Sequence, residues 1–171
     1  MGARAQVLTI IRVEGSNLVP FFVVHRQWAE GTDMLLEVLD VLSFIYSNRG
    51  YWSTEGLWDD IKKRLIEKFH ILNNDVFVTD DLIKDFFDSE LWRRLDNNVG
   101  FAILLIDMNK KGAFTGQLQL MNNDFTPTTI NEWRDRFSYY DNSNDSDAFY
   151  SGFKILMGWY DVKLIENIRL F

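Results

Sequence analysis

Residues 99–121 read VGFAILLIDMNKKGAFTGQLQLM and contain the clearest structural signal in the chain. Two strand-like runs, VGFAILLIDM and AFTGQLQLM, flank the turn residues Asn109-Lys110-Lys111-Gly112, and this arrangement predicts a β-hairpin. The first run is apolar at both odd and even positions, so both of its faces must be buried. We therefore expect it to be a central strand of a sheet that is covered by helices.

A second hairpin is predicted at the N-terminus. Residues 5–12 (AQVLTIIR) and 18–24 (LVPFFVV) are rich in β-branched and aromatic side chains, and the turn residues 14–17 separate them. Pro20 lies inside the second run and predicts an edge or a bulge there. The tail VKLIENIRLF fits a last strand, with a helix as the alternative. Together these segments predict an α+β fold, an antiparallel sheet built from two hairpins with helices packed on it, in a single domain over residues 1–171.

Four segments show helical periodicity or helix-start signals. Thr32 is a natural N-cap for a helix with a broad apolar face that ends near Gly50. Further helices are expected from Ser53 or Thr54 to about His70, over 79–95, and from Thr126-Pro127 through Phe137. A polar loop, DNSNDSD at 141–147, precedes an aromatic-rich segment at 149–160.

Composition limits the class of protein. The 171 residues are 47% apolar and 25% charged, which is typical of a globular protein. The absence of cysteine excludes disulfides, thiolate nucleophiles and zinc sites built on sulfur. The N-terminus does not resemble a signal peptide, and no apolar run is long enough to cross a bilayer, so we expect a cytoplasmic protein with no membrane partner.

The charge balance bears on the kind of partner. Eighteen Lys and Arg against 25 Asp and Glu give a net charge of −7, and no basic patch is evident. Such a surface repels nucleic acid, so direct DNA or RNA binding is disfavoured. An acidic surface can instead attract a basic groove on another protein, including a groove that normally holds nucleic acid.

Catalytic and metal-binding motifs are missing. His25 and His70 belong to no HExxH or Ser-His-Asp pattern, and no phosphate-binding glycine loop or GxSxG elbow occurs. Residues 141, 143, 145 and 147 alternate like calcium ligands, but Ser146 and Gly152 stand where the EF-hand needs Gly and Glu. A solvated turn with Asp147 as an N-cap is the better interpretation. We predict no catalytic residue, no metal and no cofactor.

The junction between the second strand and the following helix is a candidate ligand or partner site. Strand alternation puts two of its side chains on one face and two on the other. The four residues are His25 and Gln27 on one face, and Arg26 and Trp28 on the other.

Arg4 extends this candidate site. A hairpin turn near residue 15 pairs positions whose numbers sum to about 31, which brings Arg4 close to Arg26. Two guanidinium groups beside a helix start at Thr32 would form an anion-binding corner. In the alternative, structural interpretation, Arg26 pairs with Glu30 or Asp33 and fixes the strand-to-helix junction.

Tyr51 and Trp52 are candidate partner anchors, because Tyr, Trp and Arg dominate the energetics of interfaces. The chain contains 26 aromatic residues, however, and most of them must lie in the core. With Ser53 as a helix cap, Trp52 would pack on Leu57 instead.

The N-terminal 45 residues carry a resemblance. Met1-Gly2-Ala3-Arg4-Ala5, a hairpin, and then the segment HRQWAEG at 25–31 resemble a loose group of small, mostly uncharacterised phage and prophage proteins. The N-termini of that group read M-G-x-R-[SA], followed by Y-R-Q-F-D-G-Y-P. Here His25 replaces the Tyr, Trp28 replaces the Phe, Ala29-Glu30 stands at the Asp, and the Tyr-Pro is absent. The resemblance implies an accessory protein of a virus or mobile element.

These observations favour one function and leave two alternatives. The favoured hypothesis is a non-enzymatic, phage-encoded interaction protein that binds and inhibits or modulates a host protein. A defence nuclease with a basic groove, inhibited in an anti-CRISPR-like way, is its specific form. The first alternative is a small-ligand or nucleotide-binding protein, or a hydrolase, that uses the junction around His25 and Arg26. The second is a structural subunit of a larger assembly.

Overall fold

A mixed seven-stranded sheet forms the centre of the part of the chain that the computed structural model describes, which is residues 4–17, 19–27, 31–69, 76–78, 99–137 and 143–168. The strand order is β3-β2-β1-β4-β5-β6, and β7 also pairs with β5. The strands are β1 (Arg4–Val13), β2 (Pro20–Gln27), β3 (Val76–Val78), β4 (Gly100–Met108), β5 (Phe114–Asn122), β6 (Pro127–Thr128) and β7 (Val162–Leu164).

Both predicted hairpins are present, but the strands that join one hairpin to the other are parallel. β1 pairs with β2, and β4 with β5, in antiparallel fashion, while β1 runs parallel to β4 and β5 runs parallel to β7. The α+β class is confirmed, and the purely antiparallel sheet is wrong. Parallel strands need a long crossover connection, and here the chain between β1 and β4 includes β2, β3 and several helices. The parallel pairing leaves β4 in the middle of the sheet, as its apolar pattern predicts.

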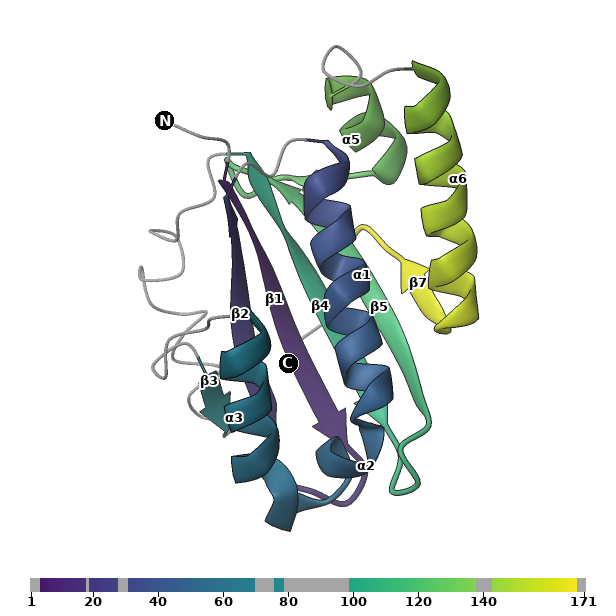
Figure 1. Cartoon of the computed structure of the whole chain (residues 1–171). Helices are drawn as coiled ribbons and strands as arrows, with labels where there is room; N and C mark the ends of the chain where they lie inside the picture. Colours follow the sequence, from purple (N-terminus) through teal and green to yellow (C-terminus); the bar gives the residue numbers. More distant parts are fainter. Residues whose placement is uncertain are drawn as a thin grey trace.

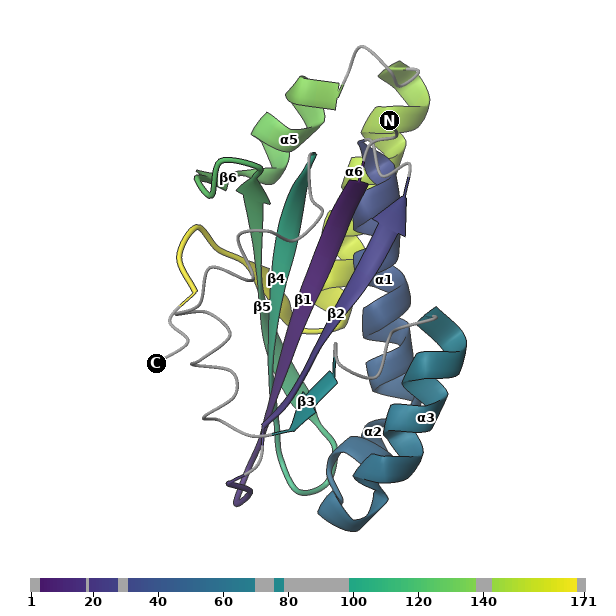
Figure 2. The same ribbon diagram turned by 90° about the vertical axis from the view of Figure 1, so that its left-hand side faces the viewer.

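The long helices lie on one side of the sheet (Figures 1 and 2). In Figure 1, α1 lies in front of the sheet, α6 runs beside it at the β5 edge, α3 lies at the β2 side, and α5 stands beyond the end of β5. The described helices are α1 (Thr32–Ser47), α2 (Arg49–Trp52), the 3-10 turn η1 (Glu55–Leu57), α3 (Trp58–Phe69), α5 (Ile130–Phe137) and α6 (Ser143–Trp159).

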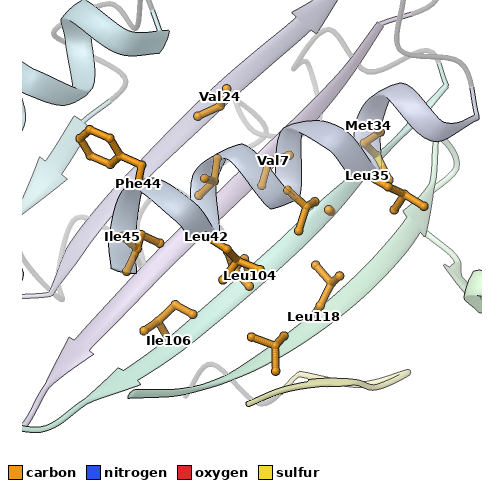
Figure 3. Close-up of a cluster of buried hydrophobic side chains, with 14 of the residues drawn as sticks. Val7, Val24, Met34, Leu35, Leu42, Phe44, Ile45, Leu104, Ile106 and Leu118 are labelled. Atoms are coloured by element: carbon orange, nitrogen blue, oxygen red, sulfur yellow. The ribbon is translucent and has the colours of Figure 1, made fainter. Parts of the chain in front are cut away.

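Two apolar clusters hold these layers together. Figure 3 shows the cluster under α1, where Met34, Leu35, Leu42 and Ile45 meet sheet residues such as Leu104. The opposite sheet face is also buried. It consists of Leu8, Ile10, Val19, Phe21, Val23, Phe101, Ile103, Leu105 and Met121, with Phe125 and Ile168 packed against it. Alternate residues of β1, β2 and β4 therefore enter different clusters, which requires apolar side chains at both odd and even positions of each strand.

Several predicted helix starts are wrong. Thr32 is the first residue of α1, and the N-cap is Gly31, whose φ of 58° suits glycine and which forms no side-chain cap bond. The helix predicted from Ser53 or Thr54 to about His70 is present as α3, but it begins only at Trp58, after the 3-10 turn η1, and the short helix α2 precedes both. The predicted helix over 79–95, like His70, lies outside the described residues.

The C-terminal third differs from its prediction in similar ways. Pro127 and Thr128 pair with β5, and Thr129 caps α5 by accepting from the Glu132 backbone N–H at 3.1 Å. The Thr129 hydroxyl also donates to the Glu132 carboxylate at 3.1 Å, which holds the first turn of α5 together. α6 begins at Ser143, so the turn with Asp147 as its cap is wrong. β7 confirms the strand interpretation of the tail at Val162–Leu164.

Candidate functional site

The β1–β2 register separates the residues that were expected to form one corner. Gln6 lies opposite His25, Ala5 opposite Arg26, and Arg4 opposite Gln27, so every pair sums to 31 as predicted. Directly opposed residues share a face, which places Arg4 on the same face as His25 and on the opposite face from Arg26. The predicted corner of two arginines is therefore wrong, because the residue opposite Arg26 is Ala5 and not Arg4. Trp28 lies outside the described residues.

Arg26 already has an internal partner. Its Nη1 donates to Glu37 Oε2 at 2.9 Å, and the Glu37 side chain is only 8% exposed. Burial raises the pKa of the Glu37 carboxyl above its ordinary value, and the charge of Arg26 lowers that pKa to a smaller extent. The partner lies one helical turn beyond the predicted Asp33, on the side of α1 that faces β2. The ion pair joins the strand to the helix, as the structural interpretation expected.

His25 bonds to a buried amide on the other sheet face. The Gln6 amide Nε2 lies 2.8 Å from His25 Nδ1, so the two side chains are hydrogen-bonded. Gln6 is fully buried, and its Oε1 has no hydrogen-bond partner among the described residues. His25 is exposed, so it is the solvent-facing member of this pair.

Trp52 lies in the core and offers no surface to a partner. It is 2% exposed, its ring stacks on Phe22 at a centroid distance of 5.9 Å, and it contacts the edge of Phe44. The predicted packing on Leu57 is replaced by these contacts, and Leu57 is 36% exposed. Trp58 Nε1 donates to the Trp52 carbonyl at 2.8 Å, which links α2 to α3.

Tyr51 is half-buried and engaged with α3. Arg64 Nη2 donates to the Tyr51 hydroxyl at 2.7 Å, and the Arg64 guanidinium carbon lies 4.3 Å from the ring centroid. This cation–π pair ties α2 to α3, so Tyr51 already has a structural role.

The largest exposed apolar side chains occur elsewhere, on α6 and the end of α1. We call Tyr46, Ile155, Leu156 and Trp159 the α6 patch. Their exposed fractions are 38%, 73%, 41% and 63%, and the rings of Tyr46 and Trp159 lie 5.3 Å apart. Scattered exposed apolar residues are ordinary, whereas a contiguous group marks an interaction surface.

The sequence contained a signal for this patch that was not used. α6 buries Tyr150, Phe153 and Met157 against the rest of the molecule, and these three residues already complete one helix face. Ile155 and Trp159 are four positions apart and form a second apolar stripe. A helix with more apolar residues than one buried face requires has a further surface to cover.

A groove of about 610 Å³ lies at the turn end of the sheet. Arg12 and Asp107 form a two-pronged ion pair there, with N–O distances of 2.6 and 2.8 Å, and Glu14, Phe114 and Asp161 also line the groove. Because Asp107 neutralises Arg12, the net charge of the groove comes from the carboxylates of Glu14 and Asp161.

Other site classes find no support within the described ranges. Those residues contain no cluster of three or more His, Asp or Glu side chains that could hold a metal ion. Over the same ranges, no helix has the length and apolar character needed to traverse a bilayer. No protein-family model, curated protein or solved structure matches this chain.

Proposed function

We propose that this chain is a non-enzymatic interaction protein that binds another protein through the α6 patch. The observation that carries the proposal is the exposure of Trp159 and Ile155 beside Tyr46 on a helix that already has a complete buried face. An aromatic side chain has about 150–250 Å² of surface, so Trp159 alone leaves roughly 150 Å² in water. Burying Trp and Tyr rings at the centre of a contact is the commonest source of strong binding energy.

The resemblance of the N-terminus to phage proteins supports a host protein as the partner. Binding would then inhibit or modulate that host protein, and inhibition of a defence nuclease is the specific form we favour. The net charge of −7 supports a partner that is basic overall, because long-range attraction raises the rate of association.

The alternative of a small-ligand site or hydrolase at the strand-to-helix junction has less support. The sheet separates Arg4 and His25 from Arg26, and Glu37 already neutralises Arg26. Under this alternative, Arg4→Ala together with Arg26→Ala should abolish binding of a co-purifying small molecule, and changes in the α6 patch should have no effect.

Affinity capture from a host lysate tests the proposal. Three tagged proteins are compared: the wild type, Ile155→Ser with Trp159→Ser, and Leu57→Ser as a matched control on an isolated exposed leucine. We expect the wild type and the control to retain the same host protein and the double variant to lose it, with all three unfolding at similar temperatures. Equal capture by all three proteins, or a nucleotide as the only co-purifying species, would refute the proposal.

A further inference from the structure

We infer that the α6 patch accepts one amphipathic helix of the partner, oriented so that carboxylates at one end of that helix lie over Arg49 and Lys111. This inference rests on the proposed function and adds the chemistry and the orientation of the bound segment.

The shape of the surface fits a single helix. α1 and α6 run side by side on the same side of the sheet (Figure 1), and exposed apolar residues occur on both. Ile155 and Trp159 are four residues apart, about 6 Å along α6 at 1.5 Å per residue, and the Trp159 ring lies 5.3 Å from the ring of Tyr46 on α1. A partner helix would present apolar anchors at spacings of three and four residues to Tyr46, Ile155 and Trp159.

The area argues against a second copy of the chain as the occupant. A stable interface needs about 800 Å² per partner, whereas Trp159 with its three neighbours offers a few hundred. Two copies would also bring together molecules that each carry a net charge of −7. A helix of a different protein avoids this like-charge repulsion, and a contact of a few hundred Å² has the size of a transient complex.

Charge gives the bound helix a direction. The Arg49 guanidinium lies 4.3 Å from the Tyr46 ring centroid, and a Cβ on Gly112 would lie 3.2 Å from Arg49 Cβ, so the β4–β5 turn packs directly against Arg49. That turn also carries Lys110 and Lys111. These three exposed cations form no ion pair within the described part of the chain.

Carboxylates also lie near this end, because Glu14 and Asp161 line the groove that reaches Asn109 and Ala113 of the β4–β5 turn. Arg12 and Asp107 of that groove neutralise each other, and the cations Arg49, Lys110 and Lys111 outnumber the two remaining carboxylates. Asp40 is exposed on α1, closer to the N-terminus of that helix. Acidic groups on the partner are therefore favoured next to Arg49 and Lys111 and disfavoured next to Asp40.

Fluorescence anisotropy with designed helices tests the inference. The probes are labelled peptides of about 18 residues, long enough to be helical, with identical Leu and Trp anchors. In the first set of peptides, the N-terminal third carries Glu, Gln or Lys at its exposed positions. In the second set, the C-terminal third carries them. The proteins are the wild type, Lys110→Glu with Lys111→Glu, and Lys62→Glu with Lys63→Glu on α3 as a charge-matched control.

We expect the wild type and the α3 control to bind the best Glu peptide about tenfold more tightly than its Lys counterpart, since exposed ion pairs contribute modestly. The Lys110/Lys111 variant should bind the Lys peptide more tightly than the Glu peptide. Added salt should reduce the difference between the two affinities for every protein. Ile155→Ser with Trp159→Ser should weaken binding of all the peptides.

Three results would overturn the inference. They are equal affinity for the Glu and Lys peptides, no binding of any peptide, and preferential binding to vesicles of phosphatidylglycerol or to a second copy in sedimentation experiments. If charge has no effect while the Ile155/Trp159 variant still loses capture from the lysate, the inference fails and the proposed function stands. If that variant retains capture, both fail.

Discussion

Replacing Gly100 by alanine should destabilise the fold strongly. Gly100 begins β4, lies opposite Ala5 on one side and Asn122 on the other, and has a φ of +142°. A Cβ at this position would lie 2.4 Å from the Met121 carbonyl oxygen and 2.9 Å from the Trp133 ring. Both approaches are closer than van der Waals contact allows.

The magnitude follows from how little the two neighbours can move. The Met121 carbonyl belongs to the backbone of β5, and fully buried Trp133 is held by its Nε1, which donates to the Gly31 carbonyl at 2.8 Å. Overpacking typically costs about 1–3 kcal/mol, and a side chain at an unfavourable φ adds about 1–3 kcal/mol. At about 2–4 °C per kcal/mol for a chain of this size, Tm should fall by roughly 5–20 °C.

The matched control is Gly50→Ala in α2, where no heavy atom lies within 4 Å of the added Cβ and φ is outside the left-handed region. This variant should be neutral, or more stable by up to about 1 kcal/mol. Thermal unfolding followed by circular dichroism, with urea titration as a second measure, compares the two variants. A Gly100→Ala protein that unfolds within about 2 °C of the wild type would refute the close packing of β4, β5 and α5.

Three further predictions concern single side chains. Because burial raises the pKa of Glu37, the native state binds its proton more tightly than the unfolded chain does, so the free energy of unfolding should fall as pH rises from the ordinary Glu pKa to the raised one. Glu37→Gln should remove that fall in urea titrations at several pH values, and an unchanged pH profile would contradict the assignment. Trp133→Phe leaves the Gly31 carbonyl without its donor and should cost about 1–3 kcal/mol in urea unfolding; a loss below about 0.5 kcal/mol would show that this bond contributes little. Asp161→Gly should raise the free energy of unfolding by about 1 kcal/mol, because Asp161 has a φ of 58°, and a lower Tm would show that its side chain has a stabilising contact.

Local signals predicted the elements whose structure depends on nearby residues. The Asn109–Gly112 turn and the alternation around it predicted the β4–β5 hairpin, and the turn near Gly15 predicted the β1–β2 register. No local signal specifies that β1 lies beside β4, because that contact joins residues 95 positions apart and depends on the helices between them. The mixed sheet was therefore beyond what the turns alone could predict.

The errors in helix placement have a different origin. The helix-start signal Thr129-x-x-Glu132 was readable in the sequence, but Pro127 drew the predicted start three residues too early. The polar stretch before Phe149 favours a loop by intrinsic propensity, yet α6 extends back to Ser143. Packing of Tyr150, Phe153 and Met157 stabilises α6 as a whole and outweighs that weak local preference.

The candidate site was misplaced because a polar cluster in sequence was taken for a cluster in space. Alternation along β2 sends His25 to Gln6 and Arg26 to Glu37, so each side chain satisfies a different part of the fold. A ligand that took Arg26 away from Glu37 would leave a buried carboxylate without its partner, at a cost of several kcal/mol. Covering Trp159 and Ile155 breaks no ion pair in the described chain and removes apolar surface from water, a gain of about 25 cal/mol per Å². Binding at the α6 patch is therefore favoured over binding at the junction, even though the junction has the richer set of ionisable residues.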